Sequence, residues 1–270
     1  MIDAHFHIWQ LARGDYGWLT PAQGAIYRDV TLDHWREVSY PCGITGGILV
    51  QAAPTNAETR FLLQQARAAS DVLGVVGWVD LLAHDVAAQI KTLAADSKLK
   101  GLRPMLQDIA DPDWILQRSL HDAFASMLEL DLTFDALVKP MHLPRIGKLA
   151  QRYPDLRIVI DHGAKPDIAN GQWQDWAGDM GRLAREPQVF CKLSGLWNEA
   201  GRDTAAAVLK PYIRHILSCF GPAKTLWGSD WPVLELAGSY PAWHQAAQEM
   251  VASPNRGAVF DAVARQVYGL

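Results

Sequence analysis

Short apolar runs alternate with longer helix-like segments eight times along this sequence. The runs cover residues 2–9, 45–51, 75–80, 99–104, 132–138, 157–162, 189–194 and 224–230. Each run is apolar on both faces, which is typical of parallel strands covered by helices, and eight such strands close into a barrel. The alternation therefore predicts an α/β fold, a (β/α)8 TIM barrel forming a single domain over residues 1–270. A doubly wound open sheet is the rival fold, but no G-x-G-x-x-G follows the first run.

Helices are expected between the runs. They are predicted at 32–39, from 55 onward, and at 84–95, 111–130, 143–153, 173–185 and 204–220, with two more at the end of the sequence. Thr55-x-x-Glu58 has the form of a capping box, which favours a helix start there. Asp111-Pro112 supplies an N-cap and a proline at the first helical position, which predicts a helix running to about Leu130.

Composition narrows the class of protein. The chain has 49% hydrophobic and 20% charged residues and a net charge of -4, so neither disorder nor a basic nucleic-acid-binding surface is indicated. Cys42, Cys191 and Cys219 lack C-x-x-C spacing, which predicts no disulfide framework or zinc ribbon and fits a reducing compartment. No signal peptide or membrane-length apolar run is seen, so we expect a cytoplasmic protein with a small-molecule partner.

The first apolar run is interrupted by Asp3, His5 and His7 at alternate positions. In a regular strand these side chains share one face, which places the two imidazoles side by side. Such a pair serves to hold a divalent metal or to polarise a substrate oxygen. The alternative is a strand that happens to carry two histidines.

Polar residues stand at or near the carboxyl ends of all eight predicted strands. They are His5, His7, Gln51, Asp80, Arg103, Asp135, His162, Lys192 with Ser194, and Asp230. In a barrel these ends meet at one mouth, where active sites are found. Gln51 and Asp80 could instead tie loops, and Asp135 could be a buried hydrogen-bonding residue. For Arg103, burial without an anion would be costly, which favours a substrate or carboxylate partner.

Tryptophans are frequent beside these polar residues. They are Trp9, Trp18, Trp78, Trp197 and Trp231. Their flat apolar faces suit a sugar ring, and Trp231 is the one taken as a substrate-binding candidate. A structural packing role is the alternative for each.

Four motifs carry a family resemblance. They are Asp3-x-His5-x-His7, Asp161-His162-Gly163-Ala164-Lys165-Pro166, Lys192-Leu193-Ser194-Gly195 and Gly228-Ser229-Asp230-Trp231-Pro232. Together, one on each of strands one, six, seven and eight, they resemble the amidohydrolase superfamily, in its branch of sugar-lactone and dicarboxylate-lactone hydrolases. The resemblance implies a distorted (β/α)8 barrel, hydrolysis of a lactone ester, and functional roles for His5, His7, His162 and Asp230.

Two departures from the family pattern bear on the metal. Amidohydrolases with two metals carry a carboxylated lysine at the end of strand four, where this sequence has Arg103, and a histidine at the end of strand five, where it has Asp135. We therefore expect at most one divalent ion, with zinc favoured, held by His5, His7 and Asp230, with His162 as a further candidate ligand. The branch also contains members that work without a metal, so a metal-independent reaction stays open.

The residue types suggest how a lactone would be hydrolysed. Asp230 is the candidate base for water, and His5, His7 and His162 would polarise the ring carbonyl, directly or through a metal. Arg103 and Lys192, with Gln51, Asp80 and Asp135, are candidates to bind the substrate. Few cationic clusters are visible, so a neutral polyhydroxylated lactone fits better than one with two carboxylates. A metal-dependent decarboxylase and a non-catalytic binding protein are the two rival functions.

Overall fold

The computed structural model describes residues 1–202 and 204–270 of the chain. Eight strands form one parallel sheet in which spatial order follows chain order. The strands are β1 (Ile2–Phe6), β2 (Gly46–Val50), β3 (Val72–Gly77), β4 (Leu99–Leu102), β5 (Thr133–Ala136), β6 (Ile158–Ile160), β7 (Val189–Leu193) and β8 (Thr225–Trp227). The sheet closes because the His7 N–H donates to the Trp231 carbonyl and the Asp230 N–H to the His5 carbonyl, both at 2.8 Å. The predicted (β/α)8 barrel is confirmed.

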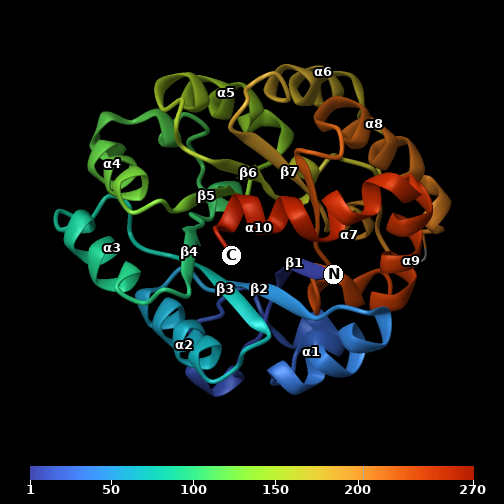
Figure 1. Ribbon diagram of the computed structural model, residues 1–270, viewed down its shortest axis with the longest axis horizontal. Helices are drawn as coiled ribbons and strands as arrows, with labels where there is room; N and C mark the ends of the chain where they lie inside the picture. Colours follow the sequence, from blue (N-terminus) through green and yellow to red (C-terminus); the bar gives the residue numbers. More distant parts are fainter. Residues whose placement is uncertain (203) are drawn as a thin grey trace.

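Helices surround the barrel (Figure 1). They are α1 (Leu32–Ser39), α2 (Asn56–Arg67), α3 (Val86–Ala94), α4 (His121–Glu129), α5 (Leu143–Arg152), α6 (Gln174–Leu183), α7 (Leu196–Ala200), α8 (Lys210–Phe220), α9 (Tyr240–Met250) and α10 (Val263–Tyr268). The predicted cap at Thr55 is confirmed, since its side chain accepts from the Glu58 N–H at 3.0 Å. In the described part of the chain, no helix has the length and apolar character needed to cross a membrane.

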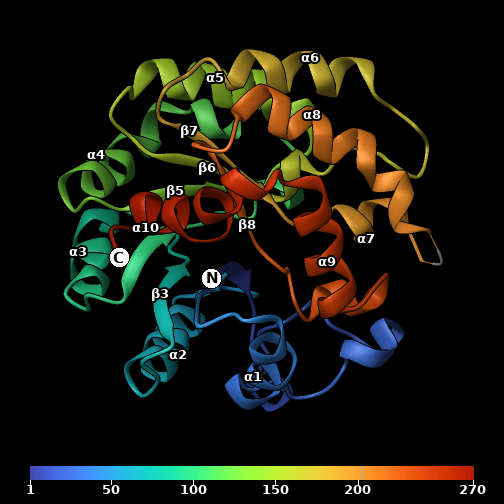
Figure 2. The same cartoon turned by 45° about the vertical axis from the view of Figure 1, so that its right-hand side comes forward.

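The barrel interior is closed at one end by α10, which lies across the sheet in both ribbon views (Figures 1 and 2). Its Val263, Ala264 and Val267 pack on inward-facing Val159 and Leu226. The hydroxyl of Thr133, the first residue of β5, donates to the Val267 carbonyl at 2.7 Å, which places α10 at the amino ends of the strands. The opposite, carboxyl end of the barrel is left for the site.

One sequence prediction about β1 is wrong. Asp3 does not share a face with His5, because its carboxylate accepts hydrogen bonds from Trp35 of α1 and Tyr240 of α9, outside the barrel. The pairing of β1 with β2 shifts register between Asp3 and Phe6, so the alternation of faces is broken there. An extra residue in a strand turns the side chains that follow it to the other face.

Two predicted helices are also wrong in extent. The segment after Asp111-Pro112 forms two short 3-10 turns, Trp114–Leu116 and Arg118–Leu120, before α4 begins at His121. Likewise the predicted 204–220 helix is a 3-10 turn, Ala206–Leu209, followed by α8, and the short α7 was not anticipated. Proline-led starts fix only the first turn, and packing decides whether it continues.

Candidate active site

A cavity of about 200 Å³ opens at the carboxyl ends of the strands. Its lining residues are His7, Trp18, Ala52, Arg103, Met105, Gln107, Asp108, Leu137, His162, Lys165, Asp230 and Val233. They come from the segments after β1, β2, β4, β5, β6 and β8. The parallel barrel thus gathers side chains from distant parts of the sequence at one mouth, as active sites of this architecture require.

Three imidazoles surround the Asp230 carboxylate. Its Oδ1 lies 3.3 Å from His7 Nε2, 3.7 Å from His5 Nε2 and 3.8 Å from His162 Nε2. Burial raises the pKa of the Asp230 carboxyl, but the nearby imidazoles of His162, His7 and His5 outweigh it, and the net pKa is lowered. Asp230 is therefore ionised at neutral pH, as a base must be.

The tautomer of His7 bears on metal binding. Its Nδ1 lies 2.8 Å from the Val50 carbonyl, an acceptor, so Nδ1 carries the proton and the lone pair of a neutral His7 is on Nε2. That lone pair points toward Asp230 Oδ1 and toward His5 Nε2 at 3.2 Å. His5, His7 and Asp230 each offer one ligand atom within 4.8 Å of the others. Two imidazole nitrogens and a carboxylate are a donor set that fits one divalent cation.

Arg103 takes the place where a second cation would be held. Its Nη1 lies 3.3 Å from His5 Nε2 and 3.2 Å from Asp161 Oδ2, and Nη2 donates to the Gln51 carbonyl. Only 3% of Arg103 is exposed. A guanidinium already neutralises Asp161, so the carboxylate has little to offer a further metal ion.

Below the imidazoles lies a layer of fully buried charges. Lys192 Nζ lies 2.5 Å from Asp135 Oδ2, 3.0 Å from Asp161 Oδ1 and 3.3 Å from His5 Nδ1. Tyr268 of α10 donates its hydroxyl to Asp135 at 2.8 Å. Burial raises the pKa of Asp135 to about 6 despite the Lys192 ammonium, so this carboxyl is still ionised at neutral pH.

The charges of this buried cluster do not cancel. Three carboxylates, Asp135, Asp161 and Asp230, face two cations, Arg103 and Lys192. Burial is the main cause that lowers the pKa of His5, and likewise that of His162 to about 4, so neither adds a positive charge at neutral pH. With His7 also neutral, one negative charge is left over, and a buried uncompensated charge is costly. A cation or a proton delivered by substrate chemistry would balance it.

Two glycines make room for the imidazoles. A Cβ at Gly228 would lie 2.7 Å from the Cβ of His5, and one at Gly195 would lie 2.6 Å from the ring of His162. Gly195 also has a φ of 64°, which other residues adopt only at a cost. His162 Nδ1 is 2.9 Å from the Ser194 hydroxyl, so the Ser194-Gly195 pair holds this ring from two sides.

The structure places the sequence-predicted residues at three depths. His7, Arg103, His162 and Asp230 line the cavity, with His5 directly behind them. Asp135, Lys192 and Gln51 are fully buried beneath it, where the Gln51 amide donates to the Arg103 carbonyl at 2.8 Å. The remaining two candidates are not brought into the cavity. Exposed Asp80 accepts from the Leu82 N–H within its own loop, and buried Trp231 donates to Glu235.

Several cavity residues escaped the sequence prediction. Met105, Gln107, Asp108 and Val233 lie in or next to 3-10 turns, where no periodicity marks them. Leu137 belongs to the predicted run 132–138, where nothing distinguishes it from its apolar neighbours. Among the tryptophans considered, Trp18 reaches the cavity, where its indole N–H donates to the Ala52 carbonyl at 2.7 Å. Asp161 could have been anticipated, because it precedes His162 in a motif already recognised.

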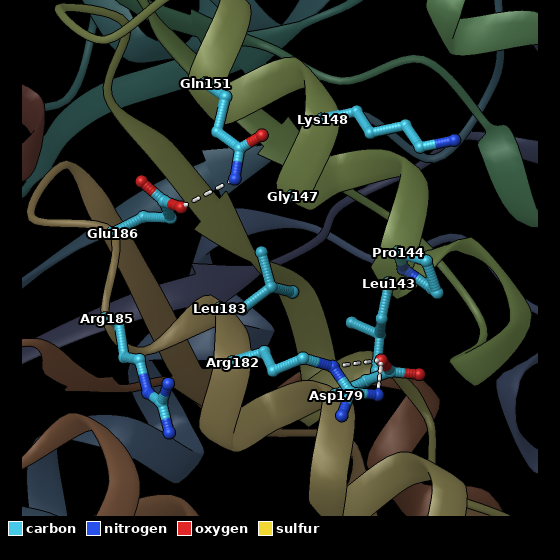
Figure 3. Close-up of a pocket in the computed structure, with 10 residues that line it drawn as sticks. All are labelled: Leu143, Pro144, Gly147, Lys148, Gln151, Asp179, Arg182, Leu183, Arg185 and Glu186. Carbon is cyan, nitrogen blue, oxygen red and sulfur yellow. Dashed lines mark hydrogen bonds and ion pairs between the residues drawn. The ribbon is translucent and has the colours of Figure 1, made fainter.

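A separate groove of about 370 Å³ lies on the outside of the barrel between α5 and α6 (Figure 3). Its acidic side chains are occupied, Asp179 by Arg182 and Glu186 by Gln151. Exposed Lys148 also lies along it. The groove contains no imidazole, and its lining shares no residue with the cavity at the barrel mouth. The catalytic candidates therefore belong to the mouth alone.

Known proteins resemble this chain over its whole length. A family model described as Amidohydrolase matches residues 2–270. An L-fucono-1,5-lactonase of Burkholderia ambifaria is 49% identical, with 90% of this chain and 84% of the relative covered. One of Burkholderia multivorans is 32% identical, with 100% and 96% covered. A crystal structure of an amidohydrolase from Burkholderia multivorans with bound zinc is 31% identical and superimposes with a TM-score of 0.92 over 100% of this chain and 99% of the other. The chain belongs to the amidohydrolase family.

Proposed function

We propose that this protein hydrolyses the ester ring of a sugar-acid lactone, with L-fucono-1,5-lactone as the first substrate to test. The observation that carries the proposal is the ionised Asp230 carboxylate surrounded by three imidazoles in a cavity at the barrel mouth. Two relatives that match 90% and 100% of this chain bear the name of that lactonase. The decarboxylase and the binding protein considered from sequence are not favoured by these relatives.

Asp230 acts in this proposal as the general base. Ring opening requires water to attack the carbonyl carbon, and a carboxylate that removes a proton from that water lowers the barrier. The lowered pKa of Asp230 keeps it ionised over the neutral range. After attack, charge develops on the carbonyl oxygen, where oriented donors stabilise it.

His162 and Arg103 are the proposed stabilisers of that oxygen. Ser194 can donate to His162 Nδ1 at 2.9 Å, and this tautomer leaves the Nε2 proton facing the cavity. Arg103 adds a fixed positive charge at the cavity wall. Gln51 and Lys192 act from below, the first on Arg103 and the second on His5, so both are positioning residues.

Zinc is the ion we propose for the place between His5, His7 and Asp230. The donor set of two imidazoles and one carboxylate suits zinc, and the Burkholderia multivorans amidohydrolase was solved with zinc bound. Bound there, the ion would act as a Lewis acid toward the carbonyl. The roles given to the side chains above stand with the ion or without it.

A panel of aldonolactones followed by proton release tests the function. We expect turnover of L-fucono-1,5-lactone and, in Asp230→Asn, a loss of about 10²- to 10⁴-fold in kcat with the fold retained. Asn keeps the shape but cannot take a proton at neutral pH. An inactive wild type, or an Asp230→Asn variant with full turnover, would contradict the proposal. Release of carbon dioxide from candidate acids would point to the decarboxylase instead.

A further inference from the structure

The segment after β6 contains an unusual run of backbone conformations. His162, Gly163, Ala164 and Lys165 have φ values of 54°, 55°, 63° and 50°, so four successive residues are left-handed. A non-glycine residue pays about 1–2 kcal/mol to adopt this conformation, and three of the four are not glycine. Such strain persists only where the surroundings impose it, and it gathers at functional sites.

This left-handed turn aims Lys165 at the site. The Lys165 N–H donates to the His162 carbonyl at 2.9 Å, which closes the turn and brings the two side chains to the same cavity. Five non-glycine residues of the described chain have positive φ, and three of them, His162, Lys165 and Asp230, line that cavity. Lys165 thus shares its backbone strain with the two residues already proposed for the chemistry.

The Lys165 ammonium makes no close ion pair within the described residues. Within residues 1–202 and 204–270, its one ion pair is with Glu199 of α7, at 3.7 Å, which is beyond hydrogen-bond distance. About a quarter of its side chain is exposed, 23%, so solvent reaches it from the mouth. Its three N–H donors are therefore available to a bound molecule.

The other polar side chains of the cavity are less suited to give a proton to the leaving oxygen. His7 gives its Nδ1 proton to Val50, and Trp18 gives its indole proton to Ala52. Arg103 is bonded to Asp161 and to the Gln51 carbonyl, and a guanidinium does not release its proton in proteins. His162 accepts from Ser194 at Nδ1, and its Nε2 proton is the one proposed above for the carbonyl oxygen.

We propose that Lys165 is the general acid that protonates the ring oxygen as the lactone opens, an inference that rests on the proposed lactonase function. Water bonds to the carbonyl carbon while Asp230 takes one of its protons. When the carbonyl re-forms, the ring C–O bond breaks, its electron pair goes to the ring oxygen, and that oxygen takes a proton from Lys165. Lys165 then regains a proton from solvent and Asp230 releases one. In sum, one lactone and one water are converted into one hydroxy acid.

Three variants test the assignment on L-fucono-1,5-lactone. Lys165→Met removes both charge and proton, whereas Lys165→Arg keeps the charge but cannot give the proton. We expect each to lose about 10²-fold in kcat. Lys148→Met, the same substitution on the exposed face of α5, should keep wild-type kcat. An Arg variant with wild-type kcat would show that charge alone is needed and would overturn the proposal.

The leaving group gives a second, independent readout. Dihydrocoumarin is a lactone whose leaving oxygen is a phenoxide, comparable with tyrosine at a pKa of about 10, so it departs without an acid. We expect Lys165→Met to lose less than about fivefold on this substrate. Equal losses on both lactones would make Lys165 a binding residue, and no loss on either would mean that Asp230 returns the proton itself. Both results overturn the proposal, whereas a wild type that opens no lactone would instead remove the proposed function on which it rests.

Discussion

Gly195 shows how a residue without a side chain determines the geometry of a catalytic one. It lies against the His162 ring, follows Ser194, and has a positive φ. A larger residue at this position meets two costs at once, an unfavourable backbone conformation and a collision with the imidazole. The position of the His162 ring, which faces Asp230, therefore depends on the absence of a Cβ atom at residue 195.

Gly195→Ala should separate this effect from a simple loss of flexibility. The new Cβ would lie 2.6 Å from His162, so the ring must move, and a displacement of this order costs about tenfold to 10²-fold in kcat/KM. Gly178→Ala in α6 is the control, since its Cβ would meet nothing closer than 3.6 Å. That variant should keep its activity, and its unfolding free energy should rise by about 0.5–1 kcal/mol. Unchanged kinetics in Gly195→Ala would mean that His162 adapts freely.

Glu58 is a buried carboxyl outside the cavity whose titration should affect stability. Its carboxylate accepts from the Tyr16 hydroxyl at 2.7 Å and from the Ala52 N–H at 3.2 Å, with Arg13 at 3.5 Å. Burial raises the pKa of Glu58 to about 7, above its ordinary value of 4.5. Between pH 4.5 and about 7, the folded state therefore holds a proton on Glu58 that the unfolded state releases.

The stabilisation from that proton is complete below pH 4.5 and is lost as the pH rises through about 7. Chemical denaturation of the wild type and of Glu58→Gln across this range measures it. The wild-type unfolding free energy, relative to the variant, should fall by up to about 3 kcal/mol between pH 4.5 and pH 8. A difference that stays level, or that rises with pH, would show that the folded carboxyl titrates normally or is held ionised.

At the scale of elements, α10 is both a structural lid and part of the buried charge network. Its apolar residues fill the amino end of the barrel, and its Tyr268 reaches the Asp135 carboxylate that pairs with Lys192. Through Lys192 and His5 the helix is linked to the catalytic layer. A helix outside the predicted strand-end pattern thus supports the site from below.

Tyr268→Phe should show what that link contributes. The ring and its packing remain, but a buried hydrogen bond to a charged group is lost, which costs about 1.5–3 kcal/mol in unfolding free energy. Tyr40→Phe is the matched control, because it removes the 2.7 Å hydroxyl bond to Asp71 at the exposed surface and should cost less than about 1 kcal/mol. Equal losses in the two variants would argue that the Asp135 contact carries no special weight.

Elements also show which parts of the fold the sequence could predict. Strand positions followed from apolar runs that are buried on both faces, except that β3 begins and ends three residues before the predicted run 75–80. The N-cap at Thr55 followed from local chemistry. The outward turn of Asp3 could not be foreseen, because a register shift depends on the neighbouring strand rather than on the residues of β1. The depth of a polar residue was equally hidden. Lys192 and Asp80 stand near the ends of similar predicted runs, but Lys192 lies within β7 and is buried, whereas Asp80 lies beyond the end of β3 and is exposed.

At the scale of the whole molecule, the proposed metal place spans the seam of the barrel. His5 and His7 belong to the first strand and the residue after it, while Asp230 follows the eighth strand. An ion held by all three would join the two ends of the sheet in addition to the hydrogen bonds across the seam. Binding to the folded state alone raises stability by mass action.

Zinc added to metal-free protein should therefore raise the unfolding temperature. At 100 times the dissociation constant the gain is about 2.7 kcal/mol, or roughly 5–10 °C for a chain of this size. Metal analysis should find no more than one tightly held ion per chain, because Arg103 takes the second place. Asp230→Asn should lose most of the shift. Two tightly held ions per chain, or an unchanged rise in unfolding temperature in Asp230→Asn, would show that the metal binds elsewhere.

The contact between Tyr268 and Asp135 also determines when, during translation, the buried charge network can be completed. The two residues are 133 positions apart, and α10 follows all eight strands, so a ribosome must translate half of the chain after Asp135 before its partner exists. Until then Asp135, which pairs with Lys192, lacks its hydrogen bond from Tyr268, and the chain of contacts that reaches His5 through Lys192 is incomplete. A nascent chain halted before Tyr268 would hold every proposed catalytic residue but would lack the hydroxyl that supports Asp135.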